Sequence, residues 1–455
     1  MACMPRSNRY VKVVLLALTI MSIAQAAAAP AEANLANTRQ LTFGGQNAEA
    51  YWNAEGTKLI YQSTQPEWPD EQIVTIYADG SGKKLVSSGL GRNTCGYFLP
   101  NGEIIYSATD WKDKGAAPKP DMSKGYVWRL NPYFAIFRAK ADGSQRKMIL
   151  GGDGKTYYAE TTVAPDGSFM VFTSTKDGDI DIYRSDLDGK NVKRLTTDPG
   201  YDGGGFVSWD SKKIAYRRDR IDGDKEMADF KSLLSQQLVR PSKLEIWVMD
   251  ADGSNKKQVT NLGAASFAPF MHPDGKRIIF SSNYGDPAGR EFDLFIVDID
   301  GKNLKRVTNT PEFDGFPMFT KDGKKLVWAS NRNGTKPGDT NLFVADWVED
   351  GGKAPVAEAA GGNPAGARRV RVGLIPSFEE ETGGLLLDGV QPDSPAEKAG
   401  LKAGDKIIEW GGKKIDGLED IQVIFENAEA GKEVKVVVLR EGKRVEVKVT
   451  PEKID

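Results

Sequence analysis

Histidine and cysteine, on which zinc sites and many hydrolases depend, are almost absent from this chain of 455 residues. Its only histidine is His272, and its only cysteines are Cys3 and Cys95. Zinc sites need clusters of these residues, and a Ser-His-Asp triad needs a histidine beside its nucleophile. His272 stands at a repeated turn where no other repeat has histidine, and no Gly-x-Ser-x-Gly sequence is present. The sequence therefore predicts no enzyme of these types and no metal centre built on His or Cys.

An excess of charge of either sign is also missing. The chain has 61 Lys and Arg residues against 63 Asp and Glu residues, a formal net charge of −2. A nucleic-acid-binding protein would normally carry a basic patch or stripe. Nucleic acid is therefore not an expected partner.

Long apolar runs are missing after the first 30 residues, so we expect no membrane span there. The N-terminus combines basic residues before position 13 with an apolar stretch over 13–23 and small residues over 24–29. This pattern is typical of a secretory signal peptide over residues 1–29, whose removal would leave the protein in the periplasm or secreted. The alternative is an uncleaved membrane anchor, for which the apolar stretch is short.

Cleavage there would remove Cys3 and leave Cys95 alone, which excludes an intramolecular disulfide. Tyr97 and Phe98 follow Cys95 in a strand-like run. We therefore expect its thiol to be buried as a small apolar group.

An internal repeat, marked by two recurring turns, runs through residues 38–348. Each unit reads as three strands joined by a first turn and a loop, then an Asp-Gly turn and a short fourth strand ending in Leu/Val-Thr. The first turn recurs at Glu55-Gly56, Asn101-Gly102, Asp166-Gly167, Asp210-Ser211, Asp274-Gly275 and Asp322-Gly323. The second recurs at Asp79-Gly80, Asp142-Gly143, Asp188-Gly189, Asp252-Gly253 and Asp300-Gly301. Asp-Gly is a strong hairpin signal, and this period predicts a six-bladed β-propeller.

The sixth repeat supplies only three strands of its own, the last over 341–346. A fourth strand is predicted at the other end of the propeller, where residues 39–42 (Arg-Gln-Leu-Thr) match the fourth strands over 193–196 and 305–308. This pairing would close the ring and remove an exposed sheet edge. The predicted fold class is all-β, with a closed propeller over 34–348.

Two repeats carry insertions. The first, over 109–132, contains Trp111 and Trp128, which either edge one mouth of the central channel or pack locally. The second, over 219–243, has apolar residues at helical spacing. We expect an amphipathic helix over 225–238 that lies on one face of the propeller.

A second, smaller domain is expected after a Gly- and Ala-rich linker over 349–367. Residues 368–455 read as a small β-barrel or sandwich with two helices. Its strands are predicted at 369–375, 384–390, 406–410, 433–440 and 443–449. A short helix is expected to end on Gly400, and a second is expected over 418–428.

The repeats resemble the TolB-like, WD-like propeller repeats of periplasmic proteins. The resemblance rests on the turns at 165–167 and 273–275 (Pro-Asp-Gly), on Ser330-Asn331-Arg332, and on the Asp-Gly turns before each final Leu/Val-Thr. It implies that a ligand or partner sits at a mouth of the central channel. The sequence does not identify the side chains that line this channel.

Residues 368–453 look like the PDZ domains of bacterial envelope proteases. The matching sequences are Ser394-Pro395-Ala396, Ala399-Gly400-Leu401, Gly404-Asp405 and Gly411-Gly412. In that family, backbone N–H groups of a loop with a central glycine bind a peptide C-terminus, and the next strand pairs with the peptide. The resemblance implies this role for Val372, Gly373, Leu374 and Ile375.

Three further residues are candidates for the same peptide site. Ile421 and Phe425, on the helix predicted over 418–428, would form its other wall, or would pack into the core. Arg371 would add positive potential near the peptide carboxylate, or would lie with Arg369 on a solvated strand face.

No cofactor is predicted, and calcium is the alternative. Residues 177–181 (Asp-Gly-Asp-Ile-Asp) have the composition of a calcium loop but lack the bidentate glutamate at position 12. The repeated Asp-x-Asp-Gly is better explained by turn geometry.

These features favour a non-catalytic, exported binding protein. The propeller would dock a protein partner, and the PDZ-like domain would bind a peptide C-terminus or an extended segment. One alternative is an accessory subunit that delivers substrates to an envelope protease. Another is a small-molecule binder or lactonase-like hydrolase that uses the propeller channel.

Overall fold

A computed structural model describes most of the chain after residue 31. The described ranges are 32–116, 124–219, 221–241, 243–286, 291–311, 313–336, 338–349, 370–376, 383–391, 393–416 and 429–453. The predicted signal peptide, the helix predicted over 418–428 and nearly all of the predicted linker lie outside them. Within these ranges, no helix has the length and apolar character that crossing a membrane requires.

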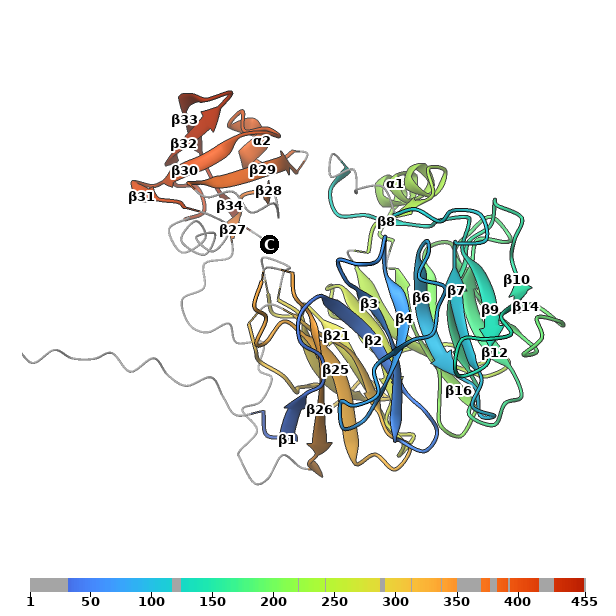
Figure 1. Cartoon of the computed structure of the whole chain (residues 1–455). Coiled ribbons are helices and arrows are strands. Elements are labelled where there is room, and N and C mark those ends of the chain that lie inside the picture. The colour runs from blue at the N-terminus through green and yellow to red at the C-terminus, as the bar shows by residue number, and fades with distance from the viewer. Residues whose placement is uncertain are drawn as a thin grey trace, which may run out of the picture. The chain divides into compact units, whose positions relative to one another are not determined.

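Six four-stranded antiparallel sheets form the blades of a propeller, as the repeat predicts (Figure 1). Blade 1 is β2 (Gln46–Trp52), β3 (Lys58–Thr64), β4 (Gln72–Tyr77) and β5 (Lys84–Leu85). Blade 2 is β6 (Asn93–Phe98), β7 (Ile104–Ala108), β9 (Ala135–Ala139) and β10 (Lys147–Leu150). Blade 3 is β11 (Tyr158–Val163), β12 (Met170–Ser174), β13 (Asp181–Ser185) and β14 (Lys193–Arg194).

The remaining blades repeat the pattern. Blade 4 is β15 (Asp202–Val207), β16 (Lys213–Asp219), β18 (Leu244–Asp250) and β19 (Lys257–Gln258). Blade 5 is β20 (Ser266–Met271), β21 (Arg277–Ser282), β22 (Asp293–Asp298) and β23 (Lys305–Arg306). Blade 6 is β24 (Asp314–Phe319), β25 (Lys325–Ser330), β26 (Asn341–Trp347) and β1 (Leu35–Gln40). The first strand of each blade is innermost, and consecutive first strands pack around the channel.

The middle strands of the blades are buried on both faces, because each blade packs between two neighbours. In β3, Leu59, Ile60 and Tyr61 are consecutive and all fully buried. Such strands read as continuous apolar runs rather than as an alternation of apolar and polar residues.

A hydroxyl after the short fourth strand of five of the blades explains the recurring Leu/Val-Thr. In blade 5, Thr308 Oγ1 accepts a hydrogen bond of 2.9 Å from the backbone N–H of Leu294 and donates one of 3.1 Å to Asp293. The blade is thereby fastened at its outer edge through buried polar groups that are fully partnered. Equivalent hydroxyls belong to Thr42, Ser87, Thr196 and Thr260.

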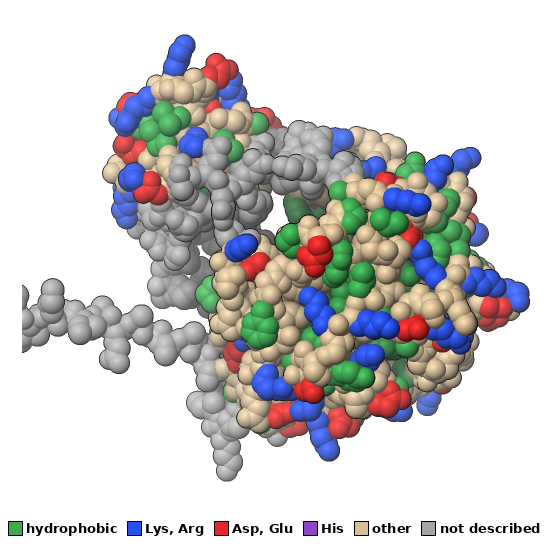
Figure 2. Space-filling view, in the orientation of Figure 1, with side chains coloured by type: hydrophobic (Ala, Val, Ile, Leu, Met, Phe, Trp, Pro, Cys, Tyr) green, Lys and Arg blue, Asp and Glu red, His purple; other side chains and the backbone are tan. Residues whose placement is uncertain are grey.

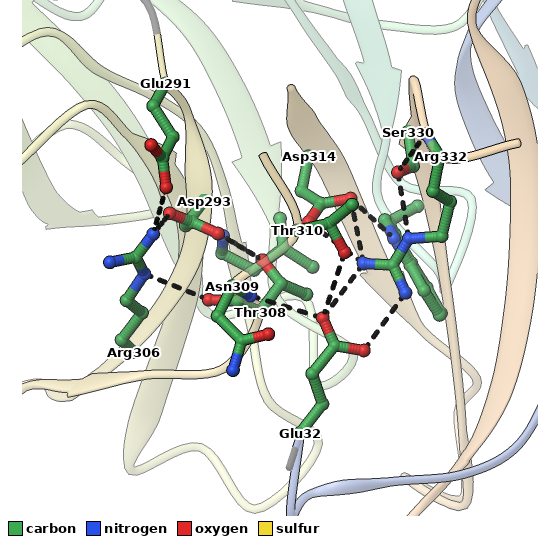
Figure 3. A network of polar contacts seen from close by, with 12 residues as sticks. Glu32, Glu291, Asp293, Arg306, Thr308, Asn309, Thr310, Asp314, Ser330 and Arg332 are labelled. Carbon is green, nitrogen blue, oxygen red and sulfur yellow. Dashed lines mark hydrogen bonds and ion pairs between the residues drawn. The ribbon is translucent and has the colours of Figure 1, made fainter. Parts of the chain in front are cut away.

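The N-terminal strand closes the ring, which confirms the predicted fold. β1 pairs antiparallel with β26, and the two strands lie side by side in Figure 1. Beyond β1, the N–H of Leu41 donates to the carbonyl of Leu342 at 2.8 Å. Just before it, Glu32 binds Arg332, which also holds the buried Asp314 (Figure 3).

The two insertions join each other over one end of the blades (Figure 1). Helix α1 (Asp224–Leu234) buries Phe230 and Leu233, as the helical spacing predicts. The helix is shorter than predicted, because the chain leaves it and forms β17 (Leu238–Val239). A left-handed φ of 60° at Gln237 redirects the backbone there, so that β17 pairs with β8 (Trp128–Arg129) of the first insertion.

The PDZ-like domain has its own core and a sheet in the order β28-β29-β30-β32-β33. These strands are β28 (Leu374–Pro376), β29 (Leu385–Val390), β30 (Lys406–Trp410), β32 (Val434–Arg440) and β33 (Lys443–Val449). Shorter elements are β27 (Val370–Arg371), β31 (Lys413–Lys414), β34 (Glu452–Lys453) and helix α2 (Pro395–Lys398). The predicted strand over 369–375 is thus divided into β27 and β28 at Gly373.

The Gly404-Asp405 sequence has a structural role in this domain. Asp405 is fully buried, and its carboxylate oxygens accept hydrogen bonds of 2.6 and 2.7 Å from Arg440. Arg440 also donates to the carbonyl of Gly400 at 2.7 Å. The pair therefore fastens the end of β32 to the segment after α2.

The surface of the propeller mixes both signs of charge. On the face that Figure 2 shows, Lys and Arg side chains are interspersed with Asp and Glu side chains, and apolar side chains form small separate groups. This distribution agrees with the near-zero net charge of the chain.

Candidate functional site

The predicted peptide loop of the PDZ-like domain lies between β27 and β28. Val372 and Leu374 are buried in the domain core at 1% and 8% exposure. The carbonyl of Val372 accepts a hydrogen bond of 2.9 Å from Ala396 N–H, and that of Gly373 accepts one of 2.8 Å from Gln391 N–H. The loop is therefore fixed against the segment that leads into α2.

Gly373 is required by the fold as well as by the predicted function. Its φ is 85°, a left-handed conformation that glycine adopts without strain. A Cβ built on it would lie 2.2 Å from Cβ of Ser394, which caps α2 by accepting a hydrogen bond from Glu397 N–H. A side chain at position 373 would therefore displace α2, and a substitution there does not test peptide binding by itself.

The strand after this loop has an open position in the sheet. Among the described residues, β28 is the terminal strand of the sheet and pairs only with β29. Such an edge can accept an extended peptide as a further strand.

The remaining predicted peptide-site residues stay predictions. Only the backbone is described for Arg371 and Ile375, which flank the loop in β27 and β28. Ile421 and Phe425 lie outside the described residues.

The sequence analysis did not identify a second site, which the six inner strands of the propeller form together. Each inner strand has a β-bulge, and one residue in each bulge has a φ between 48° and 57°. These residues are Glu49, Cys95, Glu160, Gly204, Ala268 and Phe316. A positive φ is uncommon outside glycine, and bulges re-aim side chains. All six residues line one cavity of about 40 Å³ in the channel.

A signal for these six cavity residues was present in the sequence. Each of the six residues stands six positions before the first turn of its repeat, as Glu49 does before Glu55 and Cys95 before Asn101. The residue types at this position differ among the six repeats, so the position has no common chemistry that would indicate a site.

The cavity has a polar half and an apolar half. Blades 1 to 3 supply Glu49, Cys95 and Glu160, whereas blades 4 to 6 supply glycine, alanine and phenylalanine. Tyr51, Thr161, Thr162, Phe206 and Arg217 complete the lining. Such a combination of apolar wall and a few convergent polar groups is typical of ligand sites.

Glu160 is fully partnered. It forms an ion pair with Arg217 and accepts hydrogen bonds from Tyr201 Oη at 2.7 Å, from Thr173 Oγ1 at 2.6 Å and from Gly204 N–H at 2.8 Å. The hydrogen bond to Gly204 fastens the bulge of blade 4 to blade 3. Glu160 and Arg217 therefore neutralise each other in the wall of the cavity.

Arg217 is held in turn by the insertion. Its guanidinium lies 5.4 Å from the ring of Trp128 and 5.0 Å from that of Tyr201. Trp128 thus packs against a residue of the cavity wall, whereas Trp111 donates to the carbonyl of Tyr133 at 2.6 Å and packs locally.

Glu49 has no ion-pair partner among the described residues, because the cation in the cavity lining, Arg217, is paired with Glu160. Among the described residues, Tyr51 Oη donates a hydrogen bond of 3.2 Å to it and the Cys95 thiol donates a second, but no lysine or arginine forms an ion pair with it. Burial, with repulsion from Glu71 and Glu160, raises the pKa of Glu49 to about 7. The polar half of the cavity therefore carries one carboxyl group that has no ion-pair partner among the described residues, although Arg217 attracts its charge from a distance.

Cys95 is buried, as predicted, although it lines this cavity rather than lying in a blade core. Burial and the neighbouring carboxylates raise the pKa of its thiol well above the usual value. Since the thiolate is the reactive form of cysteine, Cys95 is not poised as a nucleophile.

His272 and the aspartates near 179 have structural partners. His272 Nδ1 lies 3.1 Å from Asp274, and the imidazole packs edge-on against Phe319. Asp179 accepts from the N–H of Ile180, and Asp181 forms an ion pair of 2.5 Å with Arg194. In the described ranges, no three His, Cys, Asp or Glu residues are grouped to hold a metal ion.

The fold and the two sites define a closed six-bladed propeller followed by a PDZ-type domain. Two family models match parts of the chain: residues 238–338 match the TolB beta propeller domain, and residues 373–450 match the PDZ domain. The chain therefore carries a TolB-type propeller and a PDZ domain, as the sequence analysis expected.

Individual relatives cover parts of the chain. It is 41% identical over 73 residues to a probable periplasmic serine endoprotease DegP-like of Marinomonas sp., which is 16% of each chain. It is 44% identical over 66 residues, 14% of each chain, to a probable periplasmic serine protease do/HhoA-like of Haemophilus influenzae. The chain thus spans a small fraction of the length of the curated relatives it matches.

Two solved structures of TolB are also similar to this chain. A putative TolB from Agrobacterium tumefaciens has 17% identity and a TM-score of 0.44, and covers 67% of this chain and 91% of its own. TolB from Acinetobacter baumannii has 20% identity and a TM-score of 0.44, and covers 67% of this chain and 64% of its own.

Proposed function

We propose that this protein is an exported, non-catalytic binding scaffold of the cell envelope. The propeller docks a protein partner, and the PDZ domain binds a peptide C-terminus or an extended segment of another protein. Support for the compartment comes from the signal-peptide pattern at 1–29 and from relatives described as periplasmic.

The observation that carries the PDZ half is the position of β28. It follows the loop over 372–374 directly and stands at the edge of its sheet. A peptide that adds to this edge would place its terminal carboxylate near the loop, where backbone N–H groups and Arg371 would bind it.

The names of the relatives favour one narrower version, in which the partner is an envelope protease. Several relatives are serine proteases, and their similarity to this chain extends over about the length of one PDZ domain. In this version the protein would deliver substrates to a separate catalytic chain.

Peptide binding can be tested on the full chain with a library of peptides that vary at the last four residues. We expect selected peptides to bind with a free carboxylate and to lose at least tenfold in affinity when the terminus is amidated. If amidated and free peptides bind equally, or if no peptide binds, the PDZ half of the proposal is wrong.

A pair of variants separates the loop charge from general charge effects. Arg371→Gln should weaken binding about twofold to fivefold, the range for a solvated charge pair. Arg444→Gln makes the same charge change on β33, where Arg444 is 59% exposed and paired with Glu409. It should leave binding unchanged.

A further inference from the structure

The channel cavity is a second site of the molecule, separate from the predicted peptide loop. Its polar wall holds two carboxylates, of which Glu160 is already neutralised by Arg217. Glu49 is hydrogen-bonded by the phenol of Tyr51 and the thiol of Cys95, and it has no ion-pair partner among the described residues. A carboxylate that is shielded from water and has no ion-pair partner is destabilised. A ligand that supplies a cation would therefore gain binding free energy from the new ion pair.

The opposite wall is apolar. Ala268 and Phe316 come from blades 5 and 6, and Phe206 lies edge-on to Tyr51 with ring centroids 5.3 Å apart. Glu49 and Phe316 both remain partly exposed, so the cavity is not sealed. A ligand with a positive head and an apolar stem would match the two halves.

The size and the chemistry of the cavity limit the head group. About 40 Å³ is comparable with the space of one or two small groups the size of water. A compact ammonium group meets this limit, whereas a planar guanidinium is larger. In the described ranges, no cluster of metal-ligating side chains offers an alternative cation site.

We infer that this cavity binds a primary ammonium group on an apolar stem, with Glu49 as the carboxylate that accepts its hydrogen bonds. Phe206, Ala268 and Phe316 contact the first carbon atoms of the stem, and the rest of the stem extends out of the open side of the cavity. The ammonium belongs either to a small amine or to the N-terminus or a lysine of a partner protein. The site does not depend on the PDZ domain, so either activity can fail without the other.

The test uses n-butylamine, the isosteric n-butanol, and tetra-alanine with a free or an acetylated N-terminus, each titrated into the full chain by calorimetry. We expect n-butylamine or the free peptide to bind, and the neutral counterparts to bind at least tenfold more weakly. Binding of n-butylamine points to a small amine, and binding of the peptide alone points to a partner protein. Equal binding of charged and neutral forms overturns the inference.

The carboxylate is tested with Glu49→Gln, which should lose at least tenfold in affinity. Glu441→Gln is the matched control, because Glu441 has a φ of 51° like Glu49 but lies exposed in the β32–β33 turn. It should bind as the wild type does. If Glu49→Gln also binds as the wild type does, the inference is wrong.

The pH dependence of wild-type binding decides the question if Glu49→Gln does not fold. Because the pKa of Glu49 is about 7, its charged fraction rises about tenfold between pH 6 and pH 8. Affinity should rise by a similar factor, and an affinity that does not rise overturns the inference. The other titratable groups that face this carboxyl are Tyr51, Glu71, Cys95, Tyr97, Glu160 and Arg217.

Discussion

Arg332 donates hydrogen bonds of 3.0 Å to both carboxylate oxygens of Glu32, which lies 300 residues earlier in the chain (Figure 3). The same guanidinium donates to Asp314 at 2.9 Å. Asp314 opens the inner strand of blade 6, and Glu32 precedes the strand that completes this blade. A single side chain therefore joins the start of the ring to its end.

Replacing Arg332 should lower the free energy of unfolding far more than replacing Glu32. Arg332→Gln leaves the carboxyl of Asp314, whose side chain is fully buried, without its cation, and should lower the free energy of unfolding by about 3 kcal/mol. Glu32→Gln removes only the outer pair and should cost about 1 kcal/mol or less. Urea denaturation of both variants measures this. Equal losses would mean that the buried half of the network contributes nothing.

Gly373 and Gly404 offer a matched pair of glycines in the PDZ domain. Their φ values are 85° and 82°, but only Gly373 has a neighbour, Ser394, where a Cβ would lie. Gly404→Ala should cost about 1 kcal/mol from backbone strain. In Gly373→Ala the new Cβ also collides with Ser394. The thermal transition temperature of this domain, followed by NMR, should therefore fall much further. Similar shifts in the two variants would contradict the contact with Ser394.

Glu49 should reduce stability at high pH. Its folded pKa of about 7 is above its ordinary value of 4.5, so the folded protein holds this proton where the unfolded chain has lost it. The contribution of Glu49 to stability therefore falls as pH rises from about 4.5 to about 7, and is constant above that.

Glu49→Gln should accordingly be more stable than the wild type at pH 8, by roughly 1–2 kcal/mol, and nearly equal to it at pH 4. Urea midpoints at the two pH values give the comparison, with Glu441→Gln expected to match the wild type at both. A variant that is less stable than the wild type at pH 8 would show that Glu49 is charged and well partnered in the folded protein.

The sequence by itself determined the number of blades, the closure of the ring and the PDZ family. Each of these depends on patterns that a local window contains, such as the Asp-Gly turns and the Thr that follows the fourth strand in several repeats. The match between residues 39–42 and the other fourth strands was sufficient to place β1 beside β26. The predicted end of helix α1 was wrong, because Leu238 and Val239 pair with β8 and do not continue the helix that their apolar spacing predicted.

Only the tertiary structure decided which side chains meet in the channel and which glycine is fixed by packing. Glu49, Cys95 and Glu160 come from three blades, and a bulge with left-handed backbone turns each toward the same cavity. Nothing local in the sequence fixes that direction, because it depends on the closure of the whole ring. In the same way, the space beside Gly373 is taken by Ser394, 21 residues later, and becomes visible only when α2 is in place.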